Sequence, residues 1–555
     1  MKFTKTWVVL IIIIIFAGFL RFYQLGENPA SMNSDEAAIG YNAYSILKTG
    51  RDEYAQKFPL LFQSFDDYKL PVYIYLTVPS VAVLGLSNFS VRLLSALLGT
   101  LTVAATYFLV VALFGDTNNA LIASFLLAIS PWHLQFSRSA YEANIAVFFI
   151  VLGMTLLLNG RERPKMYIWG FVSLAISVWS YHSSRVFVPL IVLSFLILYY
   201  QSLLKQKVRI GVGLLLLFLI SLPLLVLSLS STGLVRAKGV SALDDPALTQ
   251  RNALWRLTDI REGIPFSNIL HNQRLVNSSI FIKGYLDHYN PNFFFSEIAQ
   301  GKYHVPGVGL LYIWELPFLL YGIHMVANKK GKEKWVVLLW FLFAPIAAAP
   351  TQMLPQPVRT LVFLPTLQIF VAIGLWDLYL RFVAENKSFG KLILGVCLVI
   401  IAANFYYYLH QYYVHAPIDD AQEWQYGHEQ VVSDVRLMQG RFDKVIVSTT
   451  LDEPYMFFLY YLRYDPAKYL SFGGTKSGKF DEERNAFDKY EFHTFMKTGV
   501  PLDPHALYIG TPSEVLPGAI PLVTISYPTG ESAYVISGAV SKTKWNEAGN
   551  LPHLN

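Results

Sequence analysis

Long stretches without charge recur along this chain, and they limit its possible folds more than any other feature of the sequence. A helix needs about 20 apolar residues to cross the roughly 30 Å hydrocarbon core of a bilayer. Eleven stretches come close to this length, and we expect each to be a transmembrane helix. They are residues 7–22, 91–114, 119–136, 141–159, 166–181, 186–202, 210–229, 306–327, 335–350, 360–380 and 391–412.

The composition agrees with a polytopic membrane protein whose membrane domain is all α-helical. Apolar residues make up 54% of the 555 residues and charged residues only 15%, against about 25% charged in soluble domains. The net charge of +6 includes no basic tract, so nothing indicates nucleic acid as a partner. The single cysteine, Cys397, excludes an intrachain disulfide.

The first apolar run resembles a signal peptide because it follows Lys2 and Lys5. No A-x-A-like cleavage site precedes Asn33, so we expect this run to remain as the first span.

The distribution of lysine and arginine predicts which loops face the cytoplasm. If the run 71–86 does not cross the membrane, the N-terminus and the basic loops share the inner side. These loops include KVRIG near residue 207 and the lysines at 329–334. The protein should then lie in the cytoplasmic membrane, with segments 21–90 and 230–305 and the tail outside.

The tail from residue 416 is more polar than the rest of the chain. Strand-like runs such as KVIVSTT and ALYIGT alternate with helix-like ones such as EQVVSDVRLM. This alternation predicts a small extracytoplasmic α/β domain at 416–555, following a membrane domain at 1–415.

A carboxylate pair stands just beyond the first span, in MNSDEAAIGYN. Asp35 and Glu36 begin a stretch with apolar residues at helical spacing, which predicts an amphipathic helix on the membrane surface. The alternative for Asp35 is a helix cap without chemistry. Lys69 lies in the same outer segment, directly before an apolar run, where a lysine can also simply reach the interface.

Short outer turns add further polar side chains on the same side. The positive-inside bias disfavours arginine there, so each outer arginine suggests a use such as binding an anion. The residues concerned are Arg138, Glu142, Asn144, His182, Arg185 and Arg359.

This set of side chains suits transfer of a sugar from a lipid phosphate. Cations can neutralise the charge that develops on a leaving phosphate. A carboxylate can take the proton from an incoming hydroxyl or amine. The chain has no G-x-G-x-x-G or P-loop motif for a nucleotide, so the sugar should arrive on a membrane lipid.

Several motifs in order resemble the GT-C glycosyltransferases. They are the DE pair after the first span, the K-x-P at Lys69 and the pattern Pro131, Ser137, Arg138, Glu142. The run SNFSVRLLSALLGTLTVAATYFL adds to them. The sequence is most similar to the protein O-mannosyltransferase and lipid A aminoarabinose transferase group (glycosyltransferase family 39 and its relatives), firmly over residues 1–200 and more loosely to 430.

The resemblance implies a polyprenyl-phosphate-linked sugar as donor, a protein, lipid or glycan as acceptor, inversion at the anomeric carbon and no required metal. It implies Asp35 as the base with Glu36 supporting it, and Lys69 on the donor phosphate. We add Arg138 and Arg359 as further phosphate contacts, with orientation of Glu142 by a salt bridge as the alternative for Arg138. The cleft is then expected to include Tyr41, Glu142, Asn144, His182 and Arg185.

The chain departs from the aminoarabinose transferases at two places. They have an Arg-Tyr pair where this chain has Ala38 and Ile39, and Glu-Lys-Pro-Pro where it has Tyr68 to Pro71. These differences leave the sugar and the acceptor open.

Other readings stay open as well. A lipid-linked oligosaccharide polymerase or ligase shares the helical plan, and a lipid or sugar transporter is a rival from another class. A metal site at His271, His288 and His304, with Asp287 and Glu297, is a further alternative without tight ligand spacing. Glu315, within an expected span, should mark a helix contact or a cleft floor.

Overall fold

The computed structural model describes residues 5–65, 67–230, 239, 241–243, 245–296, 301–384, 387–495 and 502–539. Their contacts divide the chain into two compact units, and each is described by itself. Unit 1 comprises Met1–Tyr23, Ser95–Ser137 and Tyr141–Gln411. Unit 2 comprises Gln24–Leu94, Arg138–Ala140 and Tyr412–Asn555.

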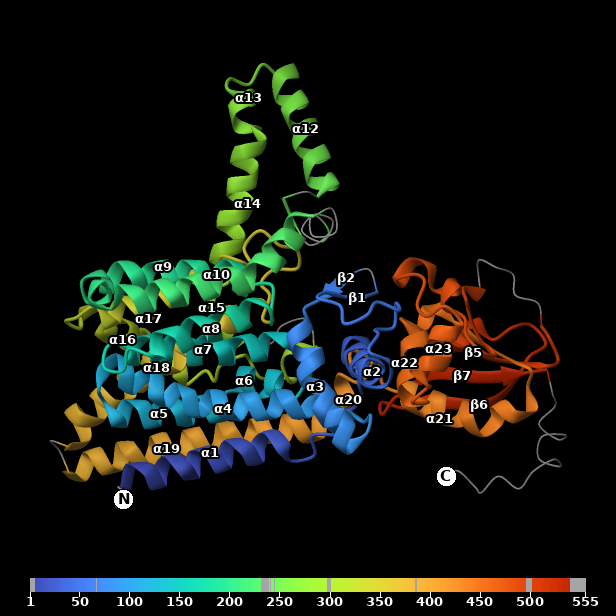
Figure 1. Ribbon diagram of the computed structural model, residues 1–555, viewed down its shortest axis with the longest axis horizontal. Helices are drawn as coiled ribbons and strands as arrows, with labels where there is room; N and C mark the ends of the chain where they lie inside the picture. The colour runs from blue at the N-terminus through green and yellow to red at the C-terminus, as the bar shows by residue number, and fades with distance from the viewer. Residues whose placement is uncertain are drawn as a thin grey trace. The chain divides into compact units, whose positions relative to one another are not determined.

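Most of unit 1 is a bundle of apolar helices that run alongside one another, and α12, α13 and α14 project from it (Figure 1). Helix α4 begins in unit 2 and continues through unit 1. The helices are α1 (Lys5–Phe22), α4 (Asn88–Phe114), α5 (Thr117–Ile129), α6 (Pro131–Ser137), α7 (Glu142–Asn159), α8 (Met166–Val178), α9 (Ser184–Leu203), α10 (Lys207–Leu229), α12 (Pro246–Arg261), α13 (Ser267–Leu270), α14 (Gln273–Asp287), α15 (Pro291–Phe295), α16 (Glu315–Asn328), α17 (Glu333–Phe343), α18 (Thr366–Leu378) and α19 (Lys387–His410).

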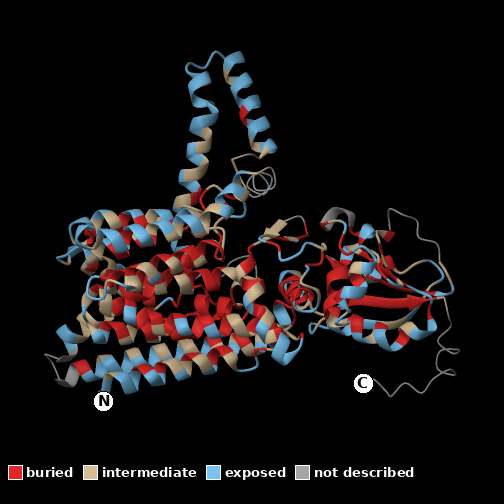
Figure 2. Ribbon diagram, viewed as in Figure 1, coloured by how far each residue is buried: buried red, intermediate tan, exposed pale blue. Residues whose placement is uncertain are grey.

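Burial follows the layers of the bundle (Figure 2). The middle helices such as α7 and α18 are mostly buried, while α1 and α19 expose apolar residues. Val399 of α19, for example, is 69% exposed. Apolar side chains on an outer helix are stable when lipid surrounds them, so the protein is a multi-pass membrane protein.

The structure does not confirm the count of eleven spans that we expected. Among the described residues, 6 helices are long and apolar enough to cross a membrane, or up to 7 if a bent pair counts as one. The pair is α5 and α6, bent by 59° at Pro131, because proline cannot continue the backbone hydrogen bonds of a helix. Helices α8, α16 and α17 have 13, 14 and 11 residues, which is short of a full crossing.

The stretch Ser184–Ser228, which counts as one of the 6 long apolar helices, consists of α9 and α10 folded into a hairpin. Arg185 Nη1, near its start, donates a hydrogen bond of 2.9 Å to Ser228 Oγ at its end. The two ends can meet only if the chain turns back, which it does near the 3-10 turn Leu204–Gln206. The separate spans expected at 186–202 and 210–229 therefore correspond to two antiparallel helices.

Glycines allow the closest helix contact in unit 1. A Cβ on Gly322 of α16 would lie 1.8 Å from the carbonyl oxygen of Phe370 in α18. A Cβ on Gly374 of α18 would lie 2.4 Å from the carbonyl oxygen of Phe318 in α16. Small residues let helix backbones approach closely in membranes, and here both partners depend on glycine.

Unit 2 combines the first outer segment with the C-terminal part of the chain. Its elements before the tail are α2 (Ser34–Thr49), β1 (Phe62–Ser64), β2 (Asp67–Lys69) and α3 (Pro71–Leu84). The tail contributes α20 (Ala416–Asp419), α21 (His428–Met438), β3 (Lys444–Ser448), α22 (Pro454–Tyr461), α23 (Pro466–Ser471), β4 (Tyr490–His493), β5 (Ala506–Gly510), β6 (Ile520–Ser526) and β7 (Ser532–Gly538).

The tail forms the small α/β fold that its sequence predicted. A five-stranded sheet has the order β4-β3-β5-β7-β6. Strands β4, β3 and β5 are parallel, and β7 runs antiparallel to both β5 and β6. Strand β5 is buried along its whole length, which explains its continuous apolar sequence ALYIG.

Helix α2 packs against α3 on one side and against α22 and α23 of the tail. The contact is tight: a Cβ on Gly40 would lie 2.7 Å from the ring of Tyr460. The hydroxyl of Tyr460 also donates to Asn88 Oδ1 at 3.2 Å. The outer segment that carries the DE pair thus shares one core with the C-terminal part.

Candidate active site

The DE pair lies in the first turn of α2, whose start is fixed by a capping box. Asn33 Oδ1 accepts from the backbone N–H of Glu36 at 2.9 Å, and Glu36 Oε2 accepts from the backbone N–H of Asn33 at 3.4 Å. This arrangement satisfies backbone donors that every helix start leaves without intrahelical partners.

Asp35 points outward from this turn and forms an ion pair with Lys69. The Asp35 side chain is 67% exposed and that of Lys69 is 13% exposed. An exposed carboxylate beside a largely covered ammonium can meet a substrate from solvent. The structure therefore brings together two residues that the sequence identified 34 positions apart.

Lys69 owes its position to a short hairpin. Strands β1 and β2 pair so that Lys69 stands opposite Phe62. The Lys69 ammonium also lies 6.0 Å from the centre of the Phe65 ring. Directly after Lys69, Leu70 and Pro71 begin α3. The rigid proline at the first helical position fixes the direction in which the chain leaves the lysine.

Glu36 faces the opposite way and is buried. Its carboxylate accepts from Arg92 Nε at 3.0 Å and Nη2 at 2.9 Å, and from the backbone N–H of Ala140 at 2.7 Å. Both side chains of the Glu36–Arg92 pair are at most 1% exposed. With this many donors, Glu36 holds the start of α2 in place. These contacts place Glu36 where it can position Asp35, and its expected support of catalysis stays a prediction.

Arg138 is buried as well. Its Nε donates to the hydroxyl of Tyr412 at 2.9 Å, and its Nη2 donates to the backbone carbonyl of Asn28 at 3.1 Å. The guanidinium also lies 5.1 Å and 5.4 Å from the ring centres of Tyr412 and Tyr413. Through these contacts, Arg138 joins Asn28 to the segment of Tyr412 and Tyr413 within unit 2.

Tyr41 does not line an open cleft. It is fully buried in α2, donates to the backbone carbonyl of Tyr464 at 3.3 Å and packs edge-on against Tyr469. Burial raises the pKa of its hydroxyl well above the ordinary value. Tyr41 joins α2 to the tail, and its expected contact with substrate stays an untested prediction.

A second acidic pair, Asp52 and Glu53, is buried in unit 2 and was not predicted from the sequence. Glu53 accepts from Asn42 Nδ2 at 2.9 Å and from Thr475 Oγ1 at 2.7 Å. Burial raises the pKa of Glu53 to about 7, with Lys69 acting in the opposite direction. The signal was present in the sequence as two adjacent carboxylates in RDEY, 16 and 17 positions before Lys69.

Asp52 is the less strongly shifted member of this pair. Its Oδ1 accepts from the backbone N–H groups of Tyr54 at 3.0 Å and Gln56 at 2.8 Å. Burial nevertheless raises the pKa of Asp52 to about 6. The loop after α2 therefore carries two carboxyl groups that titrate close to neutral pH.

The remaining predicted residues lie in unit 1. Glu142 is half-buried and starts α7. Asn144 is fully buried and donates to the backbone carbonyl of Ser95 at 2.9 Å and to Ser95 Oγ at 3.0 Å. Asn144 therefore joins α7 to α4, and its expected place in the cleft stays an untested prediction.

Arg359 and the turn before α9 lie at one end of unit 1. Arg359 Nη1 donates to Thr351 Oγ1 at 2.6 Å and to the backbone carbonyl of Gln352 at 3.1 Å. A small cavity brings the chain around Arg359 together with the start of α7 and this turn. Its lining includes Ala143, Val147, Tyr181, Ser183, Val358 and Arg359.

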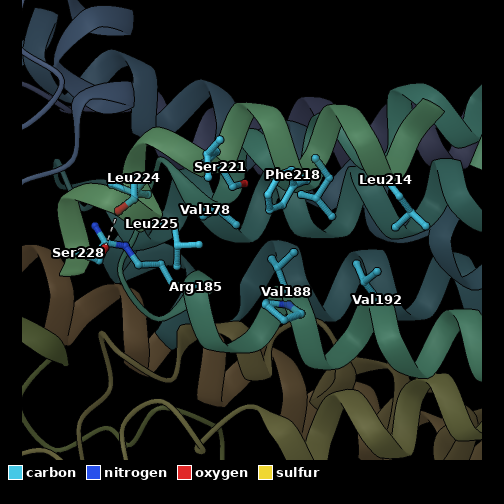
Figure 3. Close-up of a pocket in the computed structure, with 13 residues that line it drawn as sticks. Val178, Arg185, Val188, Val192, Leu214, Phe218, Ser221, Leu224, Leu225 and Ser228 are labelled. Carbon is cyan, nitrogen blue, oxygen red and sulfur yellow. Dashed lines mark hydrogen bonds between the residues drawn. The ribbon is translucent and has the colours of Figure 1, made fainter. Parts of the chain in front are cut away.

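Arg185 lies on the hairpin of α9 and α10, while His182 lies before it in the half-buried turn, next to Tyr181. An apolar groove of about 460 Å³ runs between the two helices, and Arg185 and Ser228 close one end (Figure 3). Val192 and Leu214 lie toward the other end (Figure 3). A long apolar groove with the Arg185 guanidinium at one end suits a lipid with an anionic head.

The histidines that the sequence offered as metal ligands lie apart in separate interactions. His271 bonds to Asp259 Oδ2 at 2.8 Å, His288 to the backbone carbonyl of Gly284 at 2.7 Å and His304 to that of Val305 at 3.0 Å. Glu297 lies outside the described residues. Within the described part of the chain, no group of three or more His, Cys, Asp or Glu could hold a metal ion.

Part of the chain is similar to a known protein family. Residues 11–232 match the family described as dolichyl-phosphate-mannose-protein mannosyltransferase. The matched segment is less than half of the chain, so the match is a similarity over its N-terminal part. The similarity agrees with the GT-C resemblance of the sequence, and the fold agrees with a solved structure of that type.

The sequence relatives are distant and match only in part. YycA of Bacillus subtilis, named provisionally as a mannosyltransferase, is 27% identical over 228 residues, covering 41% of this chain and 32% of the relative. An uncharacterized protein of Aquifex aeolicus is 26% identical over 204 residues, covering 36% of this chain and 40% of the relative. The matched segment thus spans well under half of either relative.

Two solved structures share the fold. ArnT of Cupriavidus metallidurans, bound to undecaprenyl phosphate, aligns with 96% of this chain and 98% of its own at a TM-score of 0.54 and 11% identity. AglB of Archaeoglobus fulgidus, in complex with an inhibitory peptide and a dolichol-phosphate, aligns with 82% of this chain and 63% of its own at a TM-score of 0.50 and 16% identity.

Proposed function

We propose that the protein transfers a sugar from a polyprenyl-phosphate-linked donor to an extracytoplasmic protein, lipid or glycan, with inversion at the anomeric carbon. The observation that carries this proposal is the ion pair of Asp35 and Lys69, with its exposed carboxylate and largely covered ammonium. The family match over residues 11–232 supports the reaction class.

In the proposed step, Asp35 accepts the proton of the acceptor hydroxyl or amine while that atom attacks the anomeric carbon. The bond between this carbon and the phosphate oxygen breaks, and its electron pair stays on the lipid phosphate. Lys69 neutralises the charge that develops there. The products are a glycosylated acceptor, a polyprenyl phosphate and a proton on Asp35.

The ion pair also suggests how donor and base are coupled. Without donor, Lys69 stabilises the charged form of Asp35 and holds it as a salt-bridge partner. A donor phosphate competes for the same ammonium and leaves the carboxylate for the acceptor. Glu36 and Arg92 fix the first turn of α2, so that Asp35 keeps its position during this exchange.

The other predicted residues take different parts in the proposal. Arg359 is retained as a cation for the donor, and Glu142, His182 and Arg185 as parts of the substrate cleft. Arg138 is proposed as a positioning residue, because Tyr412 and Asn28 engage its guanidinium. No metal is assigned a step.

We further propose eleven crossings, with unit 2 on the extracytoplasmic side. Short helices such as α8 would then complete a crossing together with their flanking turns. A C-terminal domain at 416–555 would help to select the acceptor. The packing of α2 against α22 and α23 supports this role.

The test uses full-length protein in nanodiscs and radiolabelled mannose, glucose and pentose on polyprenyl phosphate, with a membrane extract as acceptor source. We expect lipid phosphate release with one of these donors, lost in Asp35→Asn and kept in Asp419→Asn. Asp419 is an exposed aspartate of α20 in the same unit. No release with any of these monosaccharide donors would instead indicate the polymerase or ligase reading, and equal activity in Asp35→Asn would remove Asp35 from the mechanism.

A further inference from the structure

Helices α12, α13 and α14 form an arm that projects from the bundle of unit 1 (Figure 1). The arm spans residues 246–287, all of which the structure describes. It runs across the direction of the bundle helices instead of along it (Figure 1). Because the bundle helices cross the membrane, an element that runs across them extends parallel to the membrane plane.

The base of the arm is tied to the end of a bundle helix. Tyr285 Oη donates to the backbone carbonyl of Leu342 at 2.9 Å, and Tyr289 Oη donates to that of Phe341 at 3.0 Å. These carbonyls lie in the last turn of α17, where the backbone has no further helical partner. Tyrosine is also typical of the membrane–water interface. The arm therefore leaves the bundle at the level where a bundle helix ends.

A glycine makes this attachment close. A Cβ on Gly284 of α14 would lie 2.2 Å from the carbonyl oxygen of Ala349 and 2.5 Å from the side chain of Leu354. The backbone of α14 thus rests directly on the chain that follows α17. Such a contact fixes the direction of the arm at its base.

The far end of the arm is held by polar side chains. His271 Nδ1 bonds to Asn252 Oδ1 at 2.9 Å and His271 Nε2 to Asp259 Oδ2 at 2.8 Å. Asn252 Nδ2 also donates to the backbone carbonyl of His271 at 3.0 Å. These bonds join α12 to the turn before α14, so the tip has a defined shape.

The surface of the arm is unusually apolar for a segment that projects from the bundle. Phe266 at the tip is 73% exposed, and Ile269 and Leu270 are exposed beside it. Leu275, Ile282 and Leu286 form an exposed stripe along α14 at the spacing of one helical face. Apolar surface of this extent marks an interaction site.

The charges of the arm fit lipid head groups. Five basic residues accompany three acidic ones: Arg251, Arg256, Arg261, Arg274 and Lys283, with Asp259, Glu262 and Asp287. The guanidinium of Arg251 lies 5.0 Å from the ring centre of Trp255. Apolar residues mixed with arginine and tryptophan are typical of helices that lie in the membrane interface.

We propose that the α12–α14 arm lies in the membrane–water interface beside the bundle and inserts the apolar residues of its tip among the lipids. The membrane-spanning helices of the bundle are surrounded by lipid, so an arm that projects sideways from them meets lipid first. The arm would anchor the adjacent end of unit 1 to the bilayer surface. This inference is independent of the proposed transferase reaction.

Site-directed spin labelling of the full chain in nanodiscs of phosphatidylethanolamine and phosphatidylglycerol tests the proposal. Cys397→Ser removes the native cysteine, and single cysteines then replace Phe266, Ile269 or Leu275. Three references calibrate the labels: Val399→Cys on the exposed face of α19, Glu429→Cys on the exposed face of α21 and Ala175→Cys in the core.

We expect labels on the arm to be accessible to oxygen and protected from a water-soluble nickel chelate, as for Val399→Cys. Accessibility to the nickel chelate, as for Glu429→Cys, would show that the arm stands in water and would overturn the proposal. Protection from both reagents, as for Ala175→Cys, would show that protein covers the arm, for example a second copy. That result would equally overturn it.

Discussion

Lys69 and Asp35 form an ion pair that joins the end of β2 to the first turn of α2. Lys69 is largely covered and Asp35 is exposed. At this ion pair a donor phosphate could reach Lys69, and an acceptor could reach Asp35. A phosphate that binds Lys69 must compete with Asp35. Substitutions of the two residues should therefore have different effects on binding and on turnover.

Asp35→Asn should lower sugar transfer by about 10²–10⁴-fold, because the step loses its base. Binding of polyprenyl phosphate should stay the same or become tighter, because Lys69 loses its competing carboxylate. Single-turnover transfer and lipid phosphate binding, measured on the same nanodisc sample, check this split. A parallel loss of both would indicate that Asp35 serves to fold the site.

Lys69→Met keeps most of the side-chain length and removes the charge. A hydrogen bond to a charged group contributes about 1.5–3 kcal/mol, so donor affinity should fall by roughly 10- to 100-fold. Lys48→Met is the matched control, because Lys48 lies in the last turn of α2, the helix that carries Asp35, with its ammonium over the Tyr44 ring. Equal affinities for the two variants would argue against a phosphate at Lys69.

Arg92→Met should destabilise unit 2 strongly. It leaves the buried carboxylate of Glu36 without its cation, and breaking a buried pair on one side costs about 3–5 kcal/mol. Asp35→Asn breaks an ion pair with an exposed member and should cost about 0–1 kcal/mol. Thermal unfolding of the two variants, followed by fluorescence, should show a large drop in the midpoint for Arg92→Met. Similar midpoints would contradict the anchoring role of the pair.

Glu53 predicts how stability depends on pH. Burial raises its pKa from 4.5 to about 7 in the folded protein, so between these values the folded state binds more protons than the unfolded state. Stability should therefore be highest below pH 4.5, fall as the pH rises to about 7 and then level off for this group. Asp52, raised to about 6, acts in the same direction.

Melting midpoints at several pH values between 5 and 8 check this dependence. Glu53→Gln keeps the shape of the side chain and removes the titration, so its midpoint should vary less with pH than that of the wild type. An identical pH profile for both proteins would show that Glu53 does not titrate as its burial indicates.

Gly322→Ala should disrupt the bundle of unit 1, because its Cβ would meet the backbone of Phe370 at 1.8 Å. Backbone cannot move aside as a flexible side chain can, so we expect little folded protein on size-exclusion chromatography. Gly211→Ala in α10 is the matched control, since a Cβ there meets no atom within 4 Å. Normal yields for both would contradict the close crossing of α16 and α18.

The sequence predicted the type of fold because the features involved are periodic and local. Uncharged runs identify membrane helices regardless of their partners, and the alternating runs of the tail predicted its α/β sheet. The number of membrane crossings was harder to predict, because uncharged runs do not show where a helix breaks. Pro131 bends one expected span, and α16 starts only at Glu315, well inside the run 306–327.

The site was predictable only in part. Asp35 and Lys69 stood out by their position after an anchor and before an apolar run, and the structure places them in contact. Glu36 follows Asp35 directly, so it faces another side of the helix, and its partner Arg92 is 56 residues away. Tyr41 and Asn144 were predicted as cleft residues, and both are buried. The sequence does not show this, because burial depends on packing from distant segments. Asp52 and Glu53 were missed because nothing local marks their loop as buried.

Lipid phosphate release by wild type and Asp35→Asn, side by side in nanodiscs with the accepted donor and acceptor, tests the central claim most directly. The account predicts release coupled to sugar transfer in the wild type and a loss of at least about 100-fold in the variant, with the same folded yield. Undiminished release by Asp35→Asn would contradict it, because the reaction would then proceed without the proposed base.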